Sequence, residues 1–239
     1  EKQKETIDSI KYAQRIQNAL LASKTLLNKN LKNYFIYFNP KELVSGDFYW
    51  ASEINNKFYF IVADSTGHGI PGAFMSLLNI NFLNEAINEK LIENPSEILD
   101  YVRTKLIQGL AEDGSEEGGK DGMDCSLVCI DFTKMEFTYS CANNPLIYIS
   151  NNTINELEAD RMPVGKSPKD TLKFNYNTIK YNSGDILYLF TDGYADQFGG
   201  EKGKKLKHKN LRDYLFKIHQ NSILEQKELL SNEFNQWKG

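Results

Sequence analysis

The chain is poor in the residues that hold soft metals or build disulfide scaffolds. Only three cysteines and three histidines occur among its 239 residues. Cys125, Cys129 and Cys141 show no C-x-x-C spacing, and no histidine lies at ligand spacing from them, which argues against a zinc site or a disulfide framework. Because Cys125 and Cys129 lie in an apolar run, we expect small core residues of a reduced, cytosolic protein.

Long apolar runs and a strong net charge are missing as well. No stretch approaches the roughly 20 apolar residues of a membrane-spanning helix, and the charged start Glu1–Glu5 does not resemble a signal peptide. We therefore predict a cytoplasmic location, for the whole protein or for the cytoplasmic part of a larger, membrane-tethered one. The net charge of −4 predicts no nucleic-acid partner. The basic run Lys202–Lys209 is interpreted as a solvated loop.

The periodicity of the apolar residues predicts an α+β fold. Residues 6–28 follow a three–four spacing that predicts a helix, which either packs on its own domain or couples it to an upstream sensor or a second subunit. From residue 34 the pattern changes to short alternating strands with helices inserted in blocks. Glu112–Lys120 is acidic and glycine-rich and is predicted to be a mobile loop. Strands are predicted at 34–39, 47–54, 58–63, 126–132, 136–142, 146–150, 153–157, 172–179 and 186–191, and helices at 71–90, 96–110, 211–218 and 223–237.

Aspartates recur where apolar runs end. Asp64 follows the run 58–63 and Asp192 the run 186–190, and small, turn-permitting residues come after each. A third aspartate, Asp47, lies in the segment SGDFYW. Several carboxylates projected from strand ends suggest a site for a hard divalent cation, which prefers oxygen ligands. For any single Asp-Gly the alternative is a turn or cap residue.

Six motifs in order carry a resemblance to a known family: SGDFYW, VADSTGHGIPGAFMS, DGMDCSLVCID, CANNPLIYI, MPVGK and LYLFTDGYADQFGG. Together they resemble the SpoIIE-type bacterial branch of the PPM-type metal-dependent serine/threonine protein phosphatases, over roughly residues 34 to 200. The resemblance implies two stacked antiparallel sheets flanked by helices, an αββα sandwich. It also implies a linker or dimerisation helix at 1–30 and a phosphatase domain at 31–239.

The resemblance implies roles for particular residues. Asp64 would bridge two Mn2+ or Mg2+ ions, and the backbone carbonyl of Ser65 would ligate one of them. Asp192 would hold the other ion, and Asp47 would bind directly or through water. Asp121 and Asp124 would either serve an accessory metal near the substrate or form a turn before a strand.

His68 has two interpretations. It could donate a proton to the leaving serine or threonine oxygen as a general acid, because a related histidine has that role in the wider family. Its spacing from Asp64 is longer than in that family, so a structural role at the helix entrance is the alternative.

The implied activity is hydrolysis of phosphoserine or phosphothreonine on a regulatory protein in bacterial signal transduction, by metal-activated water. The alternative is a catalytically weak or inactive module that acts in dimerisation and signal relay. The family pattern continues past a Trp-x-Gly to a strand with a further metal-binding aspartate, whereas Trp237–Gly239 is the end here. We expect that the domain is truncated at this point.

Overall fold

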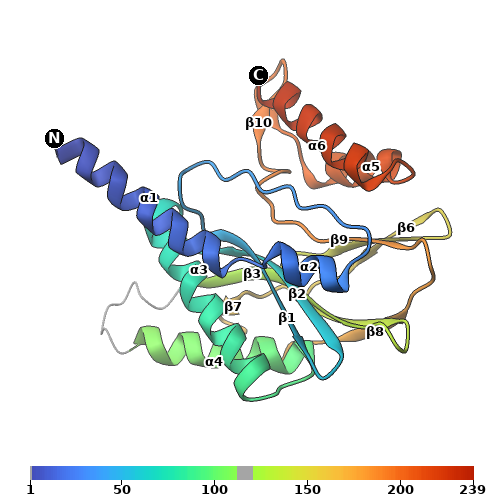
Figure 1. The fold of residues 1–239 in the computed structure, drawn as a ribbon, viewed down its shortest axis with the longest axis horizontal. Helices are drawn as coiled ribbons and strands as arrows, with labels where there is room; N and C mark the ends of the chain where they lie inside the picture. Colours follow the sequence, from blue (N-terminus) through green and yellow to red (C-terminus); the bar gives the residue numbers. More distant parts are fainter. Residues whose placement is uncertain (1, 112–120) are drawn as a thin grey trace.

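Two antiparallel sheets stacked face to face form the centre of the molecule (Figure 1). The computed structural model describes residues 2–111 and 121–239, so the loop predicted at Glu112–Lys120 lies outside the described residues. Val128 and Phe137 of the larger sheet pack against Leu146 and Tyr148 of the smaller one. This apolar contact holds the two layers together.

The larger sheet begins with two hairpin-connected strands. Asn55 and Asn56 join β1 to β2 with φ of 52° and 60°, the left-handed geometry that a two-residue hairpin turn requires and that asparagine tolerates. The predicted hairpin is therefore confirmed. The strand order is β1 (Asp47–Ile54), β2 (Lys57–Ser65), β3 (Gly122–Asp131), β4 (Glu136–Ala142) and β8 (Asn177–Lys180), with β7 (Val164–Gly165) also paired to β3.

The smaller sheet and a separate hairpin complete the strands. The smaller sheet has the order β6 (Thr153–Leu157), β5 (Leu146–Ser150) and β9 (Ile186–Tyr188). Strands β10 (Phe198–Gly199) and β11 (Lys204–Lys205) form a two-stranded hairpin of their own. Part of the basic run Lys202–Lys209 thus lies in a strand and at the start of a helix. The predicted loop is wrong for these residues, whereas the predicted solvent exposure of the lysines is confirmed.

Helices cover both outer faces of the sandwich. Helix α3 (Gly69–Asn84), a π-helical turn η1 (Glu85–Glu89) and α4 (Pro95–Ala111) enclose one apolar cluster with the larger sheet. Helices α5 (His208–Ile218) and α6 (Ile223–Lys238) enclose another with the smaller sheet. The predicted αββα sandwich is confirmed. None of the helices in the described residues combines the length and the apolar character that a bilayer crossing requires.

The single helix predicted over residues 6–28 is wrong. The chain forms α1 (Lys2–Leu20) and, after a break, α2 (Lys24–Asn30). Ser23 has extended backbone angles, and its hydroxyl accepts a hydrogen bond from the backbone N–H of Leu26 at 3.2 Å. A serine in this position satisfies a free N–H of the next helix, so the capping residue sets the break.

Three predicted strands are absent or shorter than expected. Residues 34–39 form no strand ladder; instead Tyr37 packs edge-on against Tyr194 and Phe234, each at 6.0 Å between ring centroids. The predicted strand 172–179 is reduced to its end, because carboxylates accept the backbone N–H groups of Phe174 and Asn175. The predicted strand 186–191 ends at Tyr188.

Candidate metal centre

Three predicted site residues, Asp47, Asp64 and Asp192, meet at one end of the sandwich. Asp47 opens β1 and pairs in register with Asp64, near the end of β2. Asp192 reaches the same place from the turn that follows β9. The carboxyl groups of Asp47 and Asp192 both lie close enough to Asp64 to raise its pKa. Residues far apart in the chain are therefore brought together at one centre.

A fourth aspartate flanks this centre on the next strand. Asp124 in β3 pairs in register with Asp64 on the side opposite Asp47. Asn143 donates a side-chain hydrogen bond to Asp124 Oδ1 at 2.8 Å, and Thr191 Oγ1 donates one to Asp47 Oδ2 at 3.0 Å. These donors fix the orientation of the outer carboxylates, as outer-shell partners commonly do around metal ligands.

Burial and mutual repulsion favour the neutral form of these acids. Burial, with the nearby charges of Asp47 and Asp192, raises the pKa of Asp64 to about 8. Burial also raises the pKa of Asp47, although its hydrogen bonds with Asp64 and Thr191 act in the opposite direction. The pKa of Asp124 is raised by burial, with the Asn143 hydrogen bond opposing. A bound cation would stabilise this cluster of acids, because the cation offsets the repulsion between the carboxylates.

Gly46, next to Asp47, allows the backbone to approach two carbonyl oxygens closely. A Cβ on Gly46 would lie only 2.7 Å from the carbonyl oxygens of both Ser65 and Gly67. Backbone carbonyl and carboxylate oxygens are the donor set of hard divalent cations. The residues present therefore fit Mg2+ or Mn2+.

The donors do not form a closed protein cage. Within residues 2–111 and 121–239, no group of three or more His, Cys, Asp or Glu side chains is arranged so that it could hold a metal ion by itself. A magnesium site does not require such a group, because magnesium usually keeps several waters and binds through one or two protein carboxylates.

Ser65 is held firmly in place. Its backbone N–H donates to the carbonyl of Gly46 at 3.2 Å, and its hydroxyl accepts from Asn79 of α3 at 2.9 Å. Both Ser65 and Asn79 are buried. The side chain of Ser65 thus anchors the strand end, while its carbonyl oxygen lies close to Gly46.

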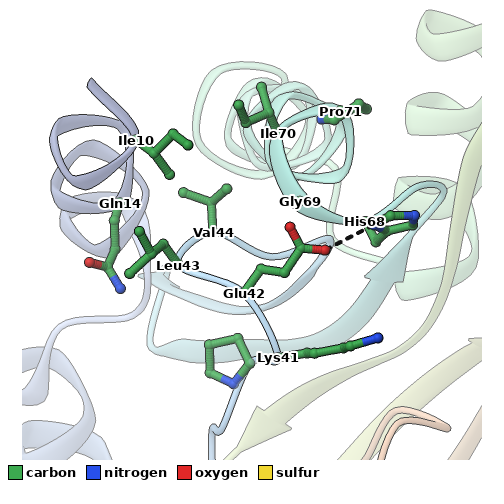
Figure 2. Close-up of a pocket in the computed structure, with 11 residues that line it drawn as sticks. Ile10, Gln14, Lys41, Glu42, Leu43, Val44, His68, Gly69, Ile70 and Pro71 are labelled. Carbon is green, nitrogen blue, oxygen red and sulfur yellow. Dashed lines mark hydrogen bonds and ion pairs between the residues drawn. The ribbon is translucent and has the colours of Figure 1, made fainter. Parts of the chain in front are cut away.

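The structure does not bring Asp121 or His68 into the aspartate contacts. The carbonyl oxygen of Asp121 lies so close to Gly165 that a Cβ there would be 2.5 Å away, and no described contact joins its carboxylate to Asp64. His68 precedes α3 with a side chain that is 96% exposed, and its Nδ1 lies 2.9 Å from Glu42 Oε1. Figure 2 shows this pair in a groove of about 820 Å³ between α1, the segment Pro40–Val44 and the start of α3.

Sequence reasoning missed the residues that orient the carboxylates. Thr191 precedes Asp192 directly, so a polar residue next to a candidate ligand was an available signal. Asn143 belongs to the motif CANNPLIYI, but its contact with Asp124 depends on the pairing of β3 with β4. Nothing in the local sequence around Asn143 indicates that the pairing of β3 with β4 brings it to Asp124.

Comparison with known proteins places these features in a family. The family model described as stage II sporulation protein E (SpoIIE) matches residues 55–238. The SiaA-PP2C domain of Pseudomonas aeruginosa matches with a TM-score of 0.88 and 27% identity, covering 99% of this chain and 92% of that one.

More distant solved structures share the fold. The PP2C phosphatase domain of SpoIIE from Bacillus subtilis, solved with a fragment of its regulatory domain, has a TM-score of 0.62 and 19% identity, over 81% of this chain and 54% of that one. RsbX, solved in complex with magnesium, has a TM-score of 0.58 and 17% identity, over 84% of each chain. No curated protein sequence matches the chain.

Proposed function

The chain belongs to the SpoIIE family of PPM-type phosphatases, and from that premise we propose that it is a divalent-metal-dependent phosphoprotein phosphatase. It would hydrolyse phosphoserine or phosphothreonine on a regulatory protein in bacterial signalling. One observation carries the proposal: Asp47, Asp64 and Asp192 converge at a single centre, where burial together with the neighbouring carboxyl groups raises the pKa of Asp64 to about 8. Such crowding destabilises an apo protein and is expected at a site built for cations.

The residues have distinct roles in this proposal. Asp47, Asp64, Asp192 and the carbonyl of Ser65 would hold two Mn2+ or Mg2+ ions. When bound, such ions lower the pKa of water and neutralise charge on the phosphoryl oxygens. Thr191 keeps the Asp47 carboxylate oriented, as its 3.0 Å hydrogen bond shows.

Two further residues are assigned more weakly. Asp124 would take part in an accessory site, because Asn143 already directs its carboxylate beside Asp64; Asp121 has no contact that supports the same role. For His68 the contact of its Nδ1 with Glu42 Oε1 favours the structural role at the entrance of α3 over the general acid.

The test is manganese-dependent hydrolysis of p-nitrophenyl phosphate and of a phosphoserine peptide. Asp64→Asn and Asp192→Asn should each lower kcat at least about 100-fold, more than the loss of an outer-shell partner costs. Asp213→Asn is the matched control, since within residues 2–111 and 121–239 this exposed carboxylate pairs with the neighbouring Arg212 alone. Circular dichroism checks the fold. Unchanged activity in both site variants would show that the site is elsewhere.

A second candidate function, dimerisation and signal relay without catalysis, is favoured by one surface. Tyr12, Ile16 and Leu20 of α1 are 63%, 43% and 42% exposed and are spaced four residues apart, so they share one helix face. We propose α1 as the linker to an upstream sensor and as a homodimer contact. Sedimentation of Ile16→Glu against Arg15→Glu tests the dimer: only the first should shift the protein to a monomer, and a wild-type monomer would refute the contact.

A further inference from the structure

Positive charge is concentrated just after the Asp192 turn. Residues 201–209 contain five lysines and one glutamate, in a chain whose net charge is −4. All five lysines are exposed. We call residues 198–209, which contain β10, β11 and the start of α5, the cationic hairpin. Its lysines are Lys202, Lys204, Lys205, Lys207 and Lys209.

Most of this charge is not neutralised within the protein. Lys205 pairs with Asp196 at 2.5 Å, and His208 pairs with Glu156 at 3.1 Å. In the part of the chain that the structure describes, the other four lysines have no carboxylate within 4.0 Å. They are therefore available to an anionic partner.

The cationic hairpin rests on an ordered support. The indole N–H of Trp237 donates to the carbonyl of Gln197 at 2.8 Å, and the N–H of Gly200 donates to the carbonyl of Trp237 at 2.7 Å. A Cβ on Gly199 would lie 1.7 Å from that same Trp237 carbonyl oxygen, so only glycine fits there. Because α6 clamps the hairpin in this way, its lysines lose less conformational freedom on binding than those of a loose loop would.

The base of the hairpin is attached to the metal centre. The N–H of Asp196 donates to the carbonyl of Asp192 at 2.7 Å, and the N–H of Lys207 donates to the carbonyl of Ala195 at 2.7 Å. From this base the chain runs outward through β10, beside the end of α6 (Figure 1). At about 3.3 Å per extended residue counted from this base, Lys202 and Lys204 lie at most roughly 25 Å from the Asp192 turn.

A phosphoprotein that approaches this site experiences electrostatic repulsion from the aspartates and electrostatic attraction from the lysines. The carboxylates of the centre repel an acidic chain, whereas the exposed lysines at its rim attract one and guide it inward. In an extended peptide, residues four to six positions from the phosphoserine lie about 13–20 Å from it, which is within the upper limit of the distance between the hairpin lysines and the Asp192 turn.

We propose that the cationic hairpin docks an acidic segment of the phosphoprotein substrate, four to six residues from the phosphorylated side chain. The inference rests on the proposed phosphatase function and adds a specificity surface to it. A protein segment is favoured over nucleic acid, because the protein as a whole carries a net charge of −4 and its lysines at 202–209 follow directly on the proposed phosphoprotein site.

The test measures binding of two fluorescent phosphoserine peptides by anisotropy, in EDTA so that no hydrolysis occurs. One peptide carries three glutamates four to six residues from the phosphoserine, and the other carries glutamines. The wild-type chain should bind the glutamate peptide about tenfold more tightly at low salt, since several exposed ion pairs each contribute a small factor. The preference should disappear at high salt, where the charges are screened.

Two triple variants decide which surface is responsible. Lys202→Glu/Lys204→Glu/Lys209→Glu should remove the preference, whereas Lys24→Glu/Lys32→Glu/Lys90→Glu, with the same change in net charge, should keep it. Equal binding of the two peptides by the wild-type chain would overturn the proposal. So would tighter binding of duplex DNA or of phosphatidylserine vesicles at the same hairpin.

Hydrolysis is measured separately, so that the two proposals fail separately. The hairpin variant should retain the wild-type kcat for p-nitrophenyl phosphate, because that ester is too small to reach the lysines. If no manganese-dependent hydrolysis occurs but the peptide preference is present, the phosphatase function fails and the docking surface stands. If hydrolysis occurs without a preference, only the docking surface fails.

Discussion

The titration of Asp64 links the candidate metal centre to the stability of the protein. In the apo protein its pKa of about 8 lies far above the 3.8 of an ordinary aspartate. The folded state therefore holds a proton between about pH 4 and pH 8 that the unfolded state has lost. By linkage, this group makes the folded state progressively less stable as the pH rises through that window.

The substitution Asp64→Asn, which mimics the protonated acid, tests whether ionisation of Asp64 destabilises the folded state. At pH 8 in EDTA we expect the free energy of unfolding to rise by about 1–3 kcal/mol, a figure reduced because the carboxyl group is partly exposed. At pH 4 the difference should nearly vanish. Urea unfolding at the two pH values measures it, with Asp213→Asn as a control that changes stability by less than about 0.5 kcal/mol. A variant less stable than wild type at pH 8 would contradict the account.

Position 46 requires glycine because the surrounding backbone leaves no room for a side chain. A Cβ there would meet two carbonyl oxygens at 2.7 Å, so Gly46→Ala forces the backbone apart and should cost about 1–3 kcal/mol of unfolding free energy. Gly109→Ala in α4 is the control, because none of the described residues outside its own helix lies within 4 Å of its Cβ position. In a helix interior that change should stabilise by up to about 1 kcal/mol. If the two variants changed the free energy of urea unfolding equally, the proposed clash with the carbonyls of Ser65 and Gly67 would be contradicted.

The site residues were only partly predictable at this scale. Asp47, Asp64 and Asp192 were found because each stands at a strand end or turn and fits a motif. Gly46 was visible in SGDFYW, but its function depends on the carbonyls of Ser65 and Gly67, which the fold supplies. Packing across the chain, rather than local pattern, decided that role.

Helix α1 is tied to the site by one buried side chain. Gln17 donates to the carbonyl of Ser45 at 2.6 Å and to the hydroxyl of Ser76 in α3 at 2.8 Å, and it accepts from the N–H of Ser45 at 3.1 Å. Ser45 in turn accepts a hydrogen bond from the N–H of Asp47 at 3.0 Å. The helix thus contacts the segment that positions a candidate ligand.

Gln17→Ala leaves these buried groups without partners. We expect a loss of about 1–3 kcal/mol in unfolding free energy. Asn18→Ala on the exposed side of the same helix should change it by less than about 0.5 kcal/mol. Hydrogen exchange should also show faster exchange at the amides of Ser45 and Asp47 in the first variant only. Wild-type protection there would mean that α1 does not stabilise the segment.

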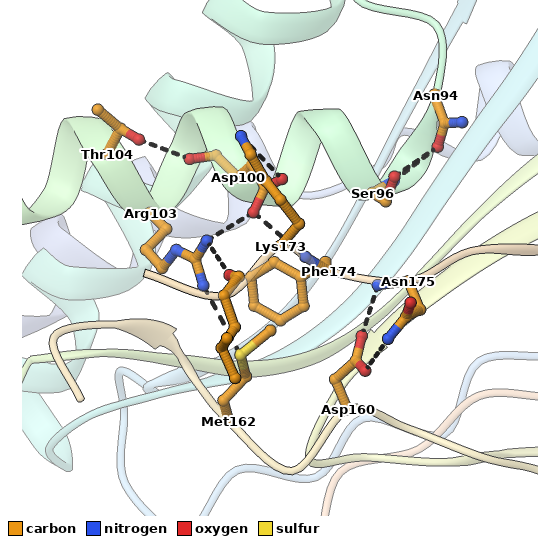
Figure 3. Close-up of polar contacts among 11 residues, drawn as sticks. Asn94, Ser96, Asp100, Arg103, Thr104, Asp160, Met162, Lys173, Phe174 and Asn175 are labelled. Atoms are coloured by element: carbon orange, nitrogen blue, oxygen red, sulfur yellow. Dashed lines mark hydrogen bonds and ion pairs between the residues drawn. The ribbon is translucent and has the colours of Figure 1, made fainter. Parts of the chain in front are cut away.

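A buried ion pair fixes the segment before β8 to helix α4 (Figure 3). Arg103 and Asp100, with side chains only 6% and 12% exposed, lie 2.6 Å apart. Arg103 also donates to the carbonyl of Leu172 at 2.6 Å and lies over the ring of Phe174. These contacts use backbone groups that a longer strand would need, which is why the strand predicted at 172–179 is short.

Breaking this pair should be costly. Arg103→Met leaves Asp100 buried without its partner, and we expect a loss of about 3–5 kcal/mol. Lys173→Met is the control, because Lys173 is exposed and reaches Asp100 only at 3.5 Å; it should cost at most about 1 kcal/mol. Thermal or urea unfolding measures both. Similar losses in the two variants would show that the burial of Arg103 has no special effect.

Element boundaries followed the sequence where hairpins are local and failed where distant groups intervene. Alternation and the pair Asn55–Asn56 predicted β1 and β2 closely. The helix break at Ser23 has a local capping signal that the apolar periodicity concealed. The lack of a ladder at 34–39 had no local signal, since it depends on distant contacts such as those of Tyr37 with Tyr194 and with Phe234 of α6.

At the scale of the whole molecule, the sandwich joins the ends of distant strands into one acidic centre with a basic rim. The layered fold was predictable from alternation and the family resemblance. The relation between the centre and the cationic hairpin was not, because it depends on how α6 supports residues 198–209. The account therefore depends most on whether the acidic centre binds a divalent cation.

Isothermal titration of the EDTA-stripped chain with manganese at pH 7 tests this most directly. We predict a saturable isotherm whose heat changes with the ionisation enthalpy of the buffer, because binding displaces the proton held by Asp64. Asp64→Asn should abolish the isotherm and Asp213→Asn should retain it. An absence of saturable heat in the wild type, or equal binding by Asp64→Asn, would contradict the metal centre.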